Sequence, residues 1–230
     1  MKYLEFTKIV SEPRMDRYLQ AANYNTRKAR TLYKFNQRLS QEIFIVIGYF
    51  EVALRNAIDR HYTHIHGSNW LNNFIEEHGI FKDTKCAPAL KIIAKAQNKH
   101  SATATHSKVL SSLEFGFWRY LFSQPQFNAA GKSLLRIFPH KPLSNSTTQY
   151  NHTYVFNKLA VINRLRNRIA HHEPICFQSR SYLISTAEVQ ETYVLLLELF
   201  QWLGIAHKPL LYGLDHVKSL SEEIEVLQNA

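Results

Sequence analysis

Apolar residues recur at three- and four-residue intervals along most of this chain, which is the period of amphipathic helices. The longest pattern runs from about residue 26 to 65, after a break at residues 23–25, and predicts one or two long helices. Thr26 is a candidate N-cap, and Gly67 ends the pattern. The positions that carry the period are Leu32, Leu39, Ile43, Val46, Ile47, Phe50, Leu54 and Ile58.

Shorter helices are predicted elsewhere within residues 1–150. Residues 123–150 contain Pro125, Pro139 and Pro142, which predict loops around one short helix at 129–138. The other predicted short helices begin near Pro13 or cover residues 70–74, 84–100 and 107–122.

Two apolar helices complete the pattern. The first covers about residues 148–172, and Pro174 stops it near His171 or His172. The second covers 185–203, with Gly204 as its C′ residue.

No strand pair is predicted, so we expect an all-α bundle. One domain should span residues 1–230, with a core at about 26–204 and peripheral segments at 1–25 and 205–230. The apolar stripe of the helix predicted at 148–172 consists of Val155, Leu159, Ile162, Leu165 and Ile169.

Composition and charge narrow the class of protein. A hydrophobic content of 45% with seven glycines is typical of a folded globular chain. The 28 Lys and Arg residues exceed the 18 Asp and Glu residues, giving a net charge of +10. This balance indicates a polyanionic partner such as nucleic acid, or simply a basic protein without one.

The cysteines and the apolar runs indicate a location. Cys86 and Cys176 have no CxxC spacing, which disfavours a disulfide scaffold or a thiol-rich metal site and fits a reducing cytoplasm. The N-terminal residues lack the apolar segment of a signal peptide. The longest apolar run, residues 43–54, is too short to cross a bilayer, which needs roughly 20 apolar residues. We therefore expect a cytoplasmic protein that does not contact a membrane, and we reject a membrane protease.

One face of the helix predicted at 148–172 carries the candidate chemistry. Asn163, Asn167 and His171 are spaced i, i+4 and i+8, so they line one face. Arg166 precedes His171 by five residues, and at 100° per residue the two point about 140° apart on an ideal helix. For Arg166 and His171 to act on one phosphate, the arginine side chain must extend around the helix, the helix end must be distorted, or a second chain in a dimer must complete the site.

These residue types suit the cleavage of RNA. A guanidinium binds phosphate and stabilises charge on its oxygens. Imidazole can take a proton from a ribose 2′-OH or give one to the leaving 5′-oxygen. An Asn amide can hold the histidine tautomer or the phosphate. The set suffices for metal-independent transesterification that leaves a 2′,3′-cyclic phosphate, and it needs no cofactor. One histidine cannot act as base and acid in the same step, so a symmetric dimer would supply both. The same polar face also occurs on helices without any catalytic role.

Three blocks of sequence resemble a known family. The string Arg166-Asn167-x-x-x-His171 resembles the signature of HEPN ribonucleases. Its continuation, HHEP, is similar to a stretch of Abi-like (abortive infection, AbiD/AbiF-type) proteins. The segments EVALRNAIDRHYTHIHGSNWL at 51–71 and LSSLEFGFWRYLFS at 110–123 resemble two further blocks of that family, in the same order.

The resemblance implies an α-helical HEPN-like bundle with additional helices. It implies a homodimer that cleaves RNA in phage defence or in a toxin–antitoxin pair, with a small RNA or a protein as the antitoxin. Arg166 and His171 would be the catalytic pair, and Asn167 the supporting residue. The alternative is a catalytically inactive HEPN module that binds RNA, a nucleotide or a partner protein.

Other polar residues are candidates for RNA binding. Arg55 and Asn56, followed by His61, form either a second, degenerate motif or a helix face with an ion pair from Glu51 to Arg55. The favoured interpretation is the ion pair, although this helix can still line an RNA groove. The supporting candidates are Asn163 and His172 beside the proposed site, and the ridge Lys91, Lys95 and Lys99, which is a candidate phosphate track.

Two further groups have an ordinary structural explanation. His61, His64 and His66 resemble metal ligands, but no Cys or carboxylate follows at zinc spacing, so we expect a solvated helix end and no metal. The aromatic residues at 115–120 can stack on unpaired bases, but at helical spacing core packing is favoured.

Overall fold

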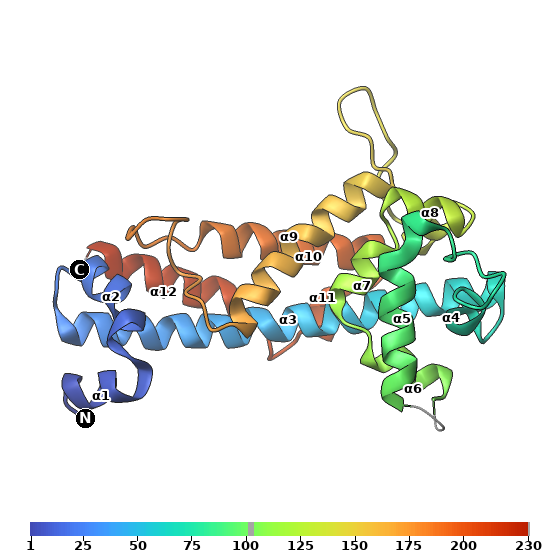
Figure 1. The fold of residues 1–230 in the computed structure, drawn as a ribbon. Helices are drawn as coiled ribbons and strands as arrows, with labels where there is room; N and C mark the ends of the chain where they lie inside the picture. Colours follow the sequence, from blue (N-terminus) through green and yellow to red (C-terminus); the bar gives the residue numbers. More distant parts are fainter. Residues whose placement is uncertain (101–103, 230) are drawn as a thin grey trace. The chain divides into compact units, whose positions relative to one another are not determined.

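The computed structural model describes residues 1–100 and 104–229, and it consists of helices joined by loops (Figure 1). Within these residues there is no β-strand, and the one isolated bridge joins Phe177 to Ile184. The prediction of an all-α fold is therefore confirmed. None of the described helices has the length and apolar character that crossing a membrane requires.

Contacts divide the chain into two compact units. Unit 1 comprises residues 1–48, 164–198 and 207–230, and unit 2 comprises residues 49–163 and 199–206. Three helices pass from one unit into the other: α3 (Thr26–His66), α9 (His152–Ala170) and α10 (Ala187–Trp202). Unit 1 also contains α1 (Tyr3–Val10), α2 (Glu12–Ala21), α11 (His207–Leu210) and α12 (Val217–Asn229). Unit 2 also contains α4 (Trp70–Asn73), η1 (Thr84–Cys86), α5 (Ala87–His100), α6 (His106–Ser112), α7 (Phe115–Tyr120), α8 (Gln124–Ala129) and η3 (Leu134–Ile137).

The pattern at 26–65 folds as the single helix α3. All eight apolar positions that predicted it are at most 1% exposed. The expected N-cap at Thr26 is wrong, because Thr26 is the first helical residue and Asn25 caps the helix. The side-chain Oδ1 of Asn25 accepts hydrogen bonds from the amides of Arg27 (3.1 Å) and Lys28 (3.0 Å). At the other end, Gly67 has a φ of +86°, a left-handed conformation that glycine adopts without strain.

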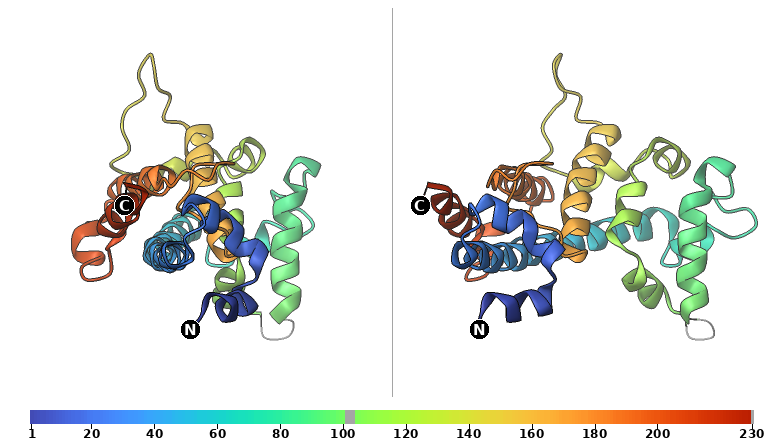
Figure 2. Two further views of the ribbon diagram at one scale, coloured as in Figure 1. Left: turned by 90° about the vertical axis from the view of Figure 1, so that its left-hand side faces the viewer. Right: turned by 60° about the vertical axis from the view of Figure 1, so that its left-hand side comes forward.

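The core of unit 1 includes segments outside residues 26–204. The ring of Tyr18 in α2 meets those of Tyr33 (5.3 Å between centroids) and Phe177 (5.2 Å), so α2 lies beside α3 (Figure 2). From α12, Val217 and Ile224 are fully buried. The terminal segments therefore help to hold α3 and the loop that contains Phe177.

Unit 2 has an aromatic core. Phe115 and Trp118 of α7 are fully buried, and Phe117 is 1% exposed. The Phe50 ring lies 6.4 Å from that of Phe115 and 5.4 Å from that of Phe200. Core packing, the favoured interpretation of this aromatic segment, is therefore observed for these three residues of α7.

The single helix expected at 107–122 is wrong, because α6 and α7 are separate. Leu113 and Glu114 between them are extended, with ψ values of 133° and 164°. The hydroxyls of Ser111 and Ser112 donate to the carbonyls of Lys108 (3.0 Å) and Val109 (2.8 Å), contacts that favour helix ends. The break buries Leu113, which is 4% exposed.

The helix expected at 129–138 is also wrong. α8 begins earlier, at Gln124, with Pro125 in its first turn, where proline is tolerated. Gly131 follows the helix at a φ of +79°. Only a short 3-10 helix, η3, occupies the remainder.

Candidate functional site

The orientation of α9 is set by its apolar stripe. Val155, Leu159, Ile162 and Leu165 are fully buried, as predicted, whereas Ile169 near the end is half-buried. The helix begins at residue 152, not 148, because the side chain of Asn151 caps it by accepting from the Tyr154 amide (3.0 Å). Burial of the stripe leaves the opposite face of the helix for polar residues.

The C-terminus of α9 is closed by a Schellman motif. The amide of His172 donates to the carbonyl of Ile169 (2.9 Å), and the amide of Glu173 donates to that of Arg168 (2.8 Å). The His171 amide still bonds to the Asn167 carbonyl (2.9 Å), so His171 is the C-cap. His172 stands at C′ with a φ of +56°, a left-handed conformation that glycine usually supplies. The prediction that the helix stops near His171 or His172 is confirmed.

The predicted catalytic residues lie at this helix end, in unit 1. Asn167 and His171 are exposed and one turn apart, so they share a face. Within residues 1–100 and 104–229, neither imidazole nitrogen of His171 has a hydrogen-bond partner. Arg166 is half-buried, and its Nε is buried without a hydrogen-bond partner among the same residues. A buried N–H left unpaired is costly, so this atom is a candidate for a function that needs it.

Arg168 fixes the loop that follows the helix. Its Nη1 lies 2.6 Å from the carboxylate of Glu188, at the start of α10, and its Nη2 donates to the carbonyl of Pro174 (2.5 Å). Its Nε lies 3.7 Å from the carboxylate of Glu173. This arginine therefore ties the end of α9 to the start of α10, and its guanidinium is already occupied by protein groups.

Two more side chains hold the same loop, and the sequence did not single them out. Asn36 of α3 is 1% exposed, and its Oδ1 accepts from the amides of Ile175 (2.8 Å) and Cys176 (3.2 Å). Arg14 of α2 donates from Nη1 to the carbonyl of His172 (2.6 Å). A buried Asn within the apolar period of α3 was the available signal for the first. Nothing in the sequence pointed to Arg14.

The predicted phosphate track lies in unit 2. Lys91, Lys95 and Lys99 are all exposed on α5. Asn163 of α9 is half-buried in the same unit, and its Nδ2 lies 3.9 Å from where a Cβ on Gly116 would be. Asn163 therefore lies close to the start of α7. The lysines of α5 therefore belong to unit 2, whereas the predicted catalytic residues belong to unit 1.

The degenerate motif on α3 is also part of unit 2. Arg55 and Asn56 are half-buried, and Arg55 Nε lies 3.5 Å from Asn56 Oδ1. His61 is occupied within the unit, because its Nε2 lies 2.9 Å from Ser133 Oγ. Burial and the nearby cation of Arg136 lower the pKa of His61.

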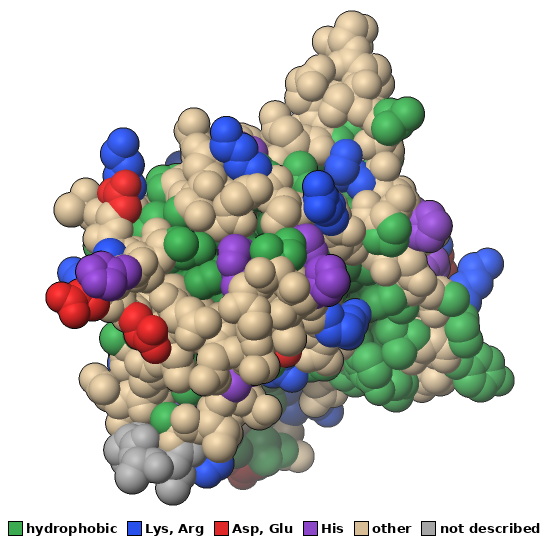
Figure 3. Space-filling model, turned by 90° about the vertical axis from the view of Figure 1, so that its right-hand side faces the viewer, with side chains coloured by type: hydrophobic (Ala, Val, Ile, Leu, Met, Phe, Trp, Pro, Cys, Tyr) green, Lys and Arg blue, Asp and Glu red, His purple; other side chains and the backbone are tan. Residues whose placement is uncertain are grey.

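The three histidines near the end of α3 have different surroundings. His66 packs against the ring of Phe74 (4.9 Å between centroids), whereas His64 is exposed. In the part of the chain that the structure describes, no group of three or more His, Cys, Asp or Glu side chains is placed to hold a metal ion. Figure 3 shows one face of the molecule, where histidines are interspersed with Lys and Arg and few acidic side chains are visible.

The segments at 51–71 and 110–123 supply the core of unit 2. The indole Nε1 of Trp70 donates to Asp59 Oδ1 (2.8 Å), and the same oxygen lies 2.7 Å from His106 Nε2. Trp70 is fully buried and its ring meets that of Tyr62 (5.0 Å). The buried residues of these segments therefore act in folding, whereas the segment at 166–172 presents polar groups to solvent.

Comparison with models of protein families gives a match over most of the chain. The model of a family described as "Abi-like protein" matches residues 2–176, which covers the end of α9 and the loop after it. No curated protein and no solved structure matches the chain.

Proposed function

The chain belongs to the Abi-like protein family, and from that premise we propose that it is a metal-independent endoribonuclease of the HEPN type that acts in phage defence. Family membership points to abortive infection; the ribonuclease activity is our proposal. The observation that carries it is the end of α9. There Asn167 and His171 share an exposed face beside a half-buried Arg166 whose Nε has no hydrogen-bond partner among the described residues.

The proposed reaction is a transesterification. His171 takes the proton of a ribose 2′-OH, and the 2′-oxygen attacks the adjacent phosphorus. The bond to the 5′-oxygen breaks, and that oxygen receives a proton. The products are a 2′,3′-cyclic phosphate and a 5′-hydroxyl. Arg166 stabilises the negative charge on the non-bridging oxygens, and Asn167 orients the phosphate or the imidazole.

We propose that the active species is a homodimer. The step needs a base and an acid at once, and each chain brings one His171 to this helix end. Two copies around one phosphate supply both, and the partner's arginine adds a second cation. A symmetric pair presents the same surface twice, so one patch beside His171 suffices for the interface.

The proposed partners are RNA and an antitoxin, which is either a small RNA or a protein. The net charge of +10 favours binding of a polyanion. Asn163, His172, Arg55 and Asn56 are proposed to support RNA binding, together with the lysines of α5.

The test is cleavage of a labelled mixed RNA in excess EDTA. We compare the wild type with Arg166→Ala and His171→Ala, with folding checked by circular dichroism. His64→Ala is the matched control, because it removes an exposed histidine outside the site. His171→Ala should lose about 10²–10⁴-fold in rate, the usual contribution of a positioned acid or base, and Arg166→Ala about 10²–10³-fold, that of one group that stabilises transition-state charge. Equal cleavage by all four proteins would refute the assignment. Salt-sensitive binding without cleavage would support an inactive RNA-binding module instead.

A mixing experiment tests the composite site. Wild type is equilibrated with increasing His171→Ala protein at constant total concentration. If both histidines are needed, activity falls with the square of the wild-type fraction. If each chain acts alone, it falls in direct proportion.

A further inference from the structure

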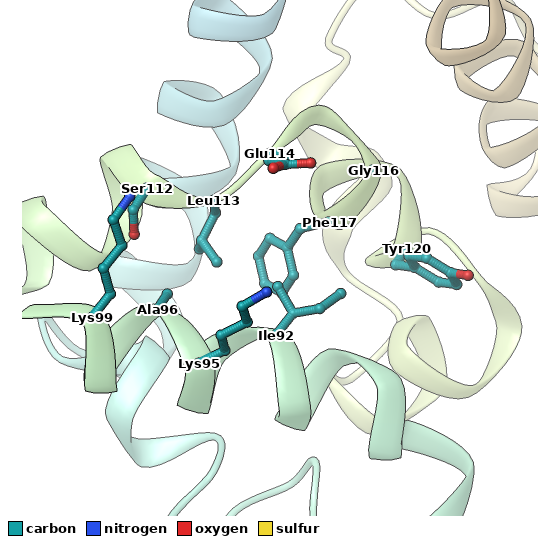
Figure 4. Close-up of a pocket in the computed structure, with 10 residues that line it drawn as sticks. All are labelled: Ile92, Lys95, Ala96, Lys99, Ser112, Leu113, Glu114, Gly116, Phe117 and Tyr120. Atoms are coloured by element: carbon teal, nitrogen blue, oxygen red, sulfur yellow. The ribbon is translucent and has the colours of Figure 1, made fainter. Parts of the chain in front are cut away.

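Unit 2 contains a cavity of about 470 Å³ beside the lysine track, between α5 and the turn that joins α6 to α7 (Figure 4). Leu113 and Phe117 form a nearly buried apolar floor, with Ile92 beside them. This volume lies in the range of small-molecule sites, roughly 300–1,000 Å³. Three of the residues that line it, Ser112, Leu113 and Glu114, lie at the break between α6 and α7.

One side of this cavity is positively charged. Lys95 and Lys99 are exposed, lie one turn apart on α5, and line the cavity. In Figure 4 the Lys95 ammonium group points toward the ring of Phe117, and that of Lys99 points toward Ser112. Neither lysine makes an ion pair within residues 1–100 and 104–229. Both ammonium groups are therefore available for an anion.

The opposite rim offers a carboxylate and an aromatic ring. Glu114 stands at the N-cap of α7, yet its side chain makes no capping hydrogen bond, and it is exposed. Tyr120 lines the cavity and is 38% exposed. The neighbouring Arg119 lies with its guanidinium 4.0 Å from the centroid of the Phe156 ring, in a cation–π contact. Neither Arg119 nor any other described residue forms an ion pair with Glu114, so its carboxylate can accept hydrogen bonds from a ligand.

The ligand must match all of these features together. A simple anion would leave the apolar floor unused, and an apolar molecule would leave two cations and a carboxylate unpaired at the rim. A nucleotide has a phosphate for the lysines, a flat ring for the floor and Tyr120, and N–H donors for Glu114. Guanine presents two adjacent donors, N1–H and N2–H, on its Watson–Crick edge, which match the two oxygens of a carboxylate.

We propose that this cavity binds one guanine nucleotide, with its phosphate at Lys95 and Lys99 and its base edge at Glu114. The nucleotide is either free in solution or one unit of a single-stranded RNA. In the second case the proposal rests on the proposed function and deepens it, because the cavity then binds one nucleotide of the substrate RNA. In both cases the site acts by binding, without chemistry of its own.

The test measures binding to the full-length chain in the His171→Ala background, so cleavage cannot consume the probe. The probes are guanosine and uridine 5′-monophosphates and the 5′-phosphorylated triribonucleotides GGG and UUU. Calorimetry measures the affinity of the protein for each probe. Guanine probes should bind more tightly than uridine probes, and Glu114→Gln should reduce that preference. Lys95→Gln/Lys99→Gln should weaken guanine binding about 100-fold or more, because loss of each charged hydrogen bond weakens binding about tenfold or more.

Lys82→Gln/Lys85→Gln is the matched control. It removes the same charge from exposed lysines of unit 2 that do not line the cavity. Binding of the monophosphate assigns a free nucleotide as a ligand, and binding of GGG alone assigns an RNA unit. Equal weakening in the two double variants, no guanine preference, or no binding of any probe overturns the proposal. The nuclease assay has a different readout. Failure to bind a guanine nucleotide therefore does not refute the proposed ribonuclease activity, and absence of cleavage does not refute nucleotide binding.

Discussion

Asn36 should be a main support of the loop that follows the candidate site. Its Oδ1 accepts from the amides of Ile175 and Cys176, and all three groups are buried. Asn36→Leu keeps a side chain of similar size but removes the acceptor, so two buried N–H groups lose their partner. An unsatisfied buried group costs about 1–3 kcal/mol.

The substitution also removes a cost. The Nδ2 of Asn36 is itself buried without a hydrogen-bond partner among the described residues, and leucine eliminates it. Two groups become unpaired and one such group disappears, so the net loss corresponds to one group, about 1–3 kcal/mol. Ser40→Ala is the matched control on the same helix. Its hydroxyl donates only to the carbonyl of Asn36 (2.8 Å), and its loss should cost less.

Urea unfolding followed by circular dichroism measures the free energy, and amide hydrogen exchange measures the loop itself. Asn36→Leu should lower the unfolding free energy and speed exchange at Ile175 and Cys176, whereas Ser40→Ala should leave those two amides protected. If Asn36→Leu is as stable as the control and both amides stay protected, the proposed role of Asn36 in holding the loop is wrong.

Three further predictions concern other residues. His172→Gly should stabilise the protein by about 1 kcal/mol, because glycine adopts the left-handed C′ conformation without strain; an unchanged or lower melting temperature would contradict this. Burial and Arg136 lower the pKa of His61 in the fold, so the unfolded chain binds its proton first as the pH falls. Stability should therefore decline below the unfolded pKa of about 6.5, and His61→Gln should flatten that part of a urea–pH profile. If the profile keeps its slope in the variant, another group is responsible. Cys86 and Cys176 are buried, and burial raises the pKa of both thiols, that of Cys176 to about 12. Neither thiol should react with Ellman's reagent until urea is added. Fast labelling of the native protein would contradict the burial of these thiols.

Some features of the fold followed from local sequence alone. The period of α3 gave its buried face, because each apolar position on a long amphipathic helix must face the core. Gly67 and Gly204 mark helix ends at φ values of +86° and +76°, a conformation that other residues adopt only with strain. Pro174 likewise stopped α9, since the residue before a proline avoids the helical region.

Other features depended on packing and were predicted wrongly. The apolar period continues from α6 into α7, so it gave no sign that Leu113 and Glu114 are extended. Burial of Leu113 and the two serine hydroxyls favour the break. Residues of that break line the cavity beside Lys95 and Lys99, so the sequence predicted the lysines only as a ridge.

Some features of the candidate site were likewise set by the sequence, and others by the tertiary structure. The string Arg166-Asn167-x-x-x-His171 and the i, i+4 spacing of Asn167 and His171 are properties of the sequence, because helical geometry alone puts those two on one face. Tertiary structure decided that Arg168 anchors the loop, that Asn36 holds it from α3, and that Arg166 has a buried Nε. Each of these facts depends on which buried polar group finds a partner, and such partners come from segments far apart in the chain.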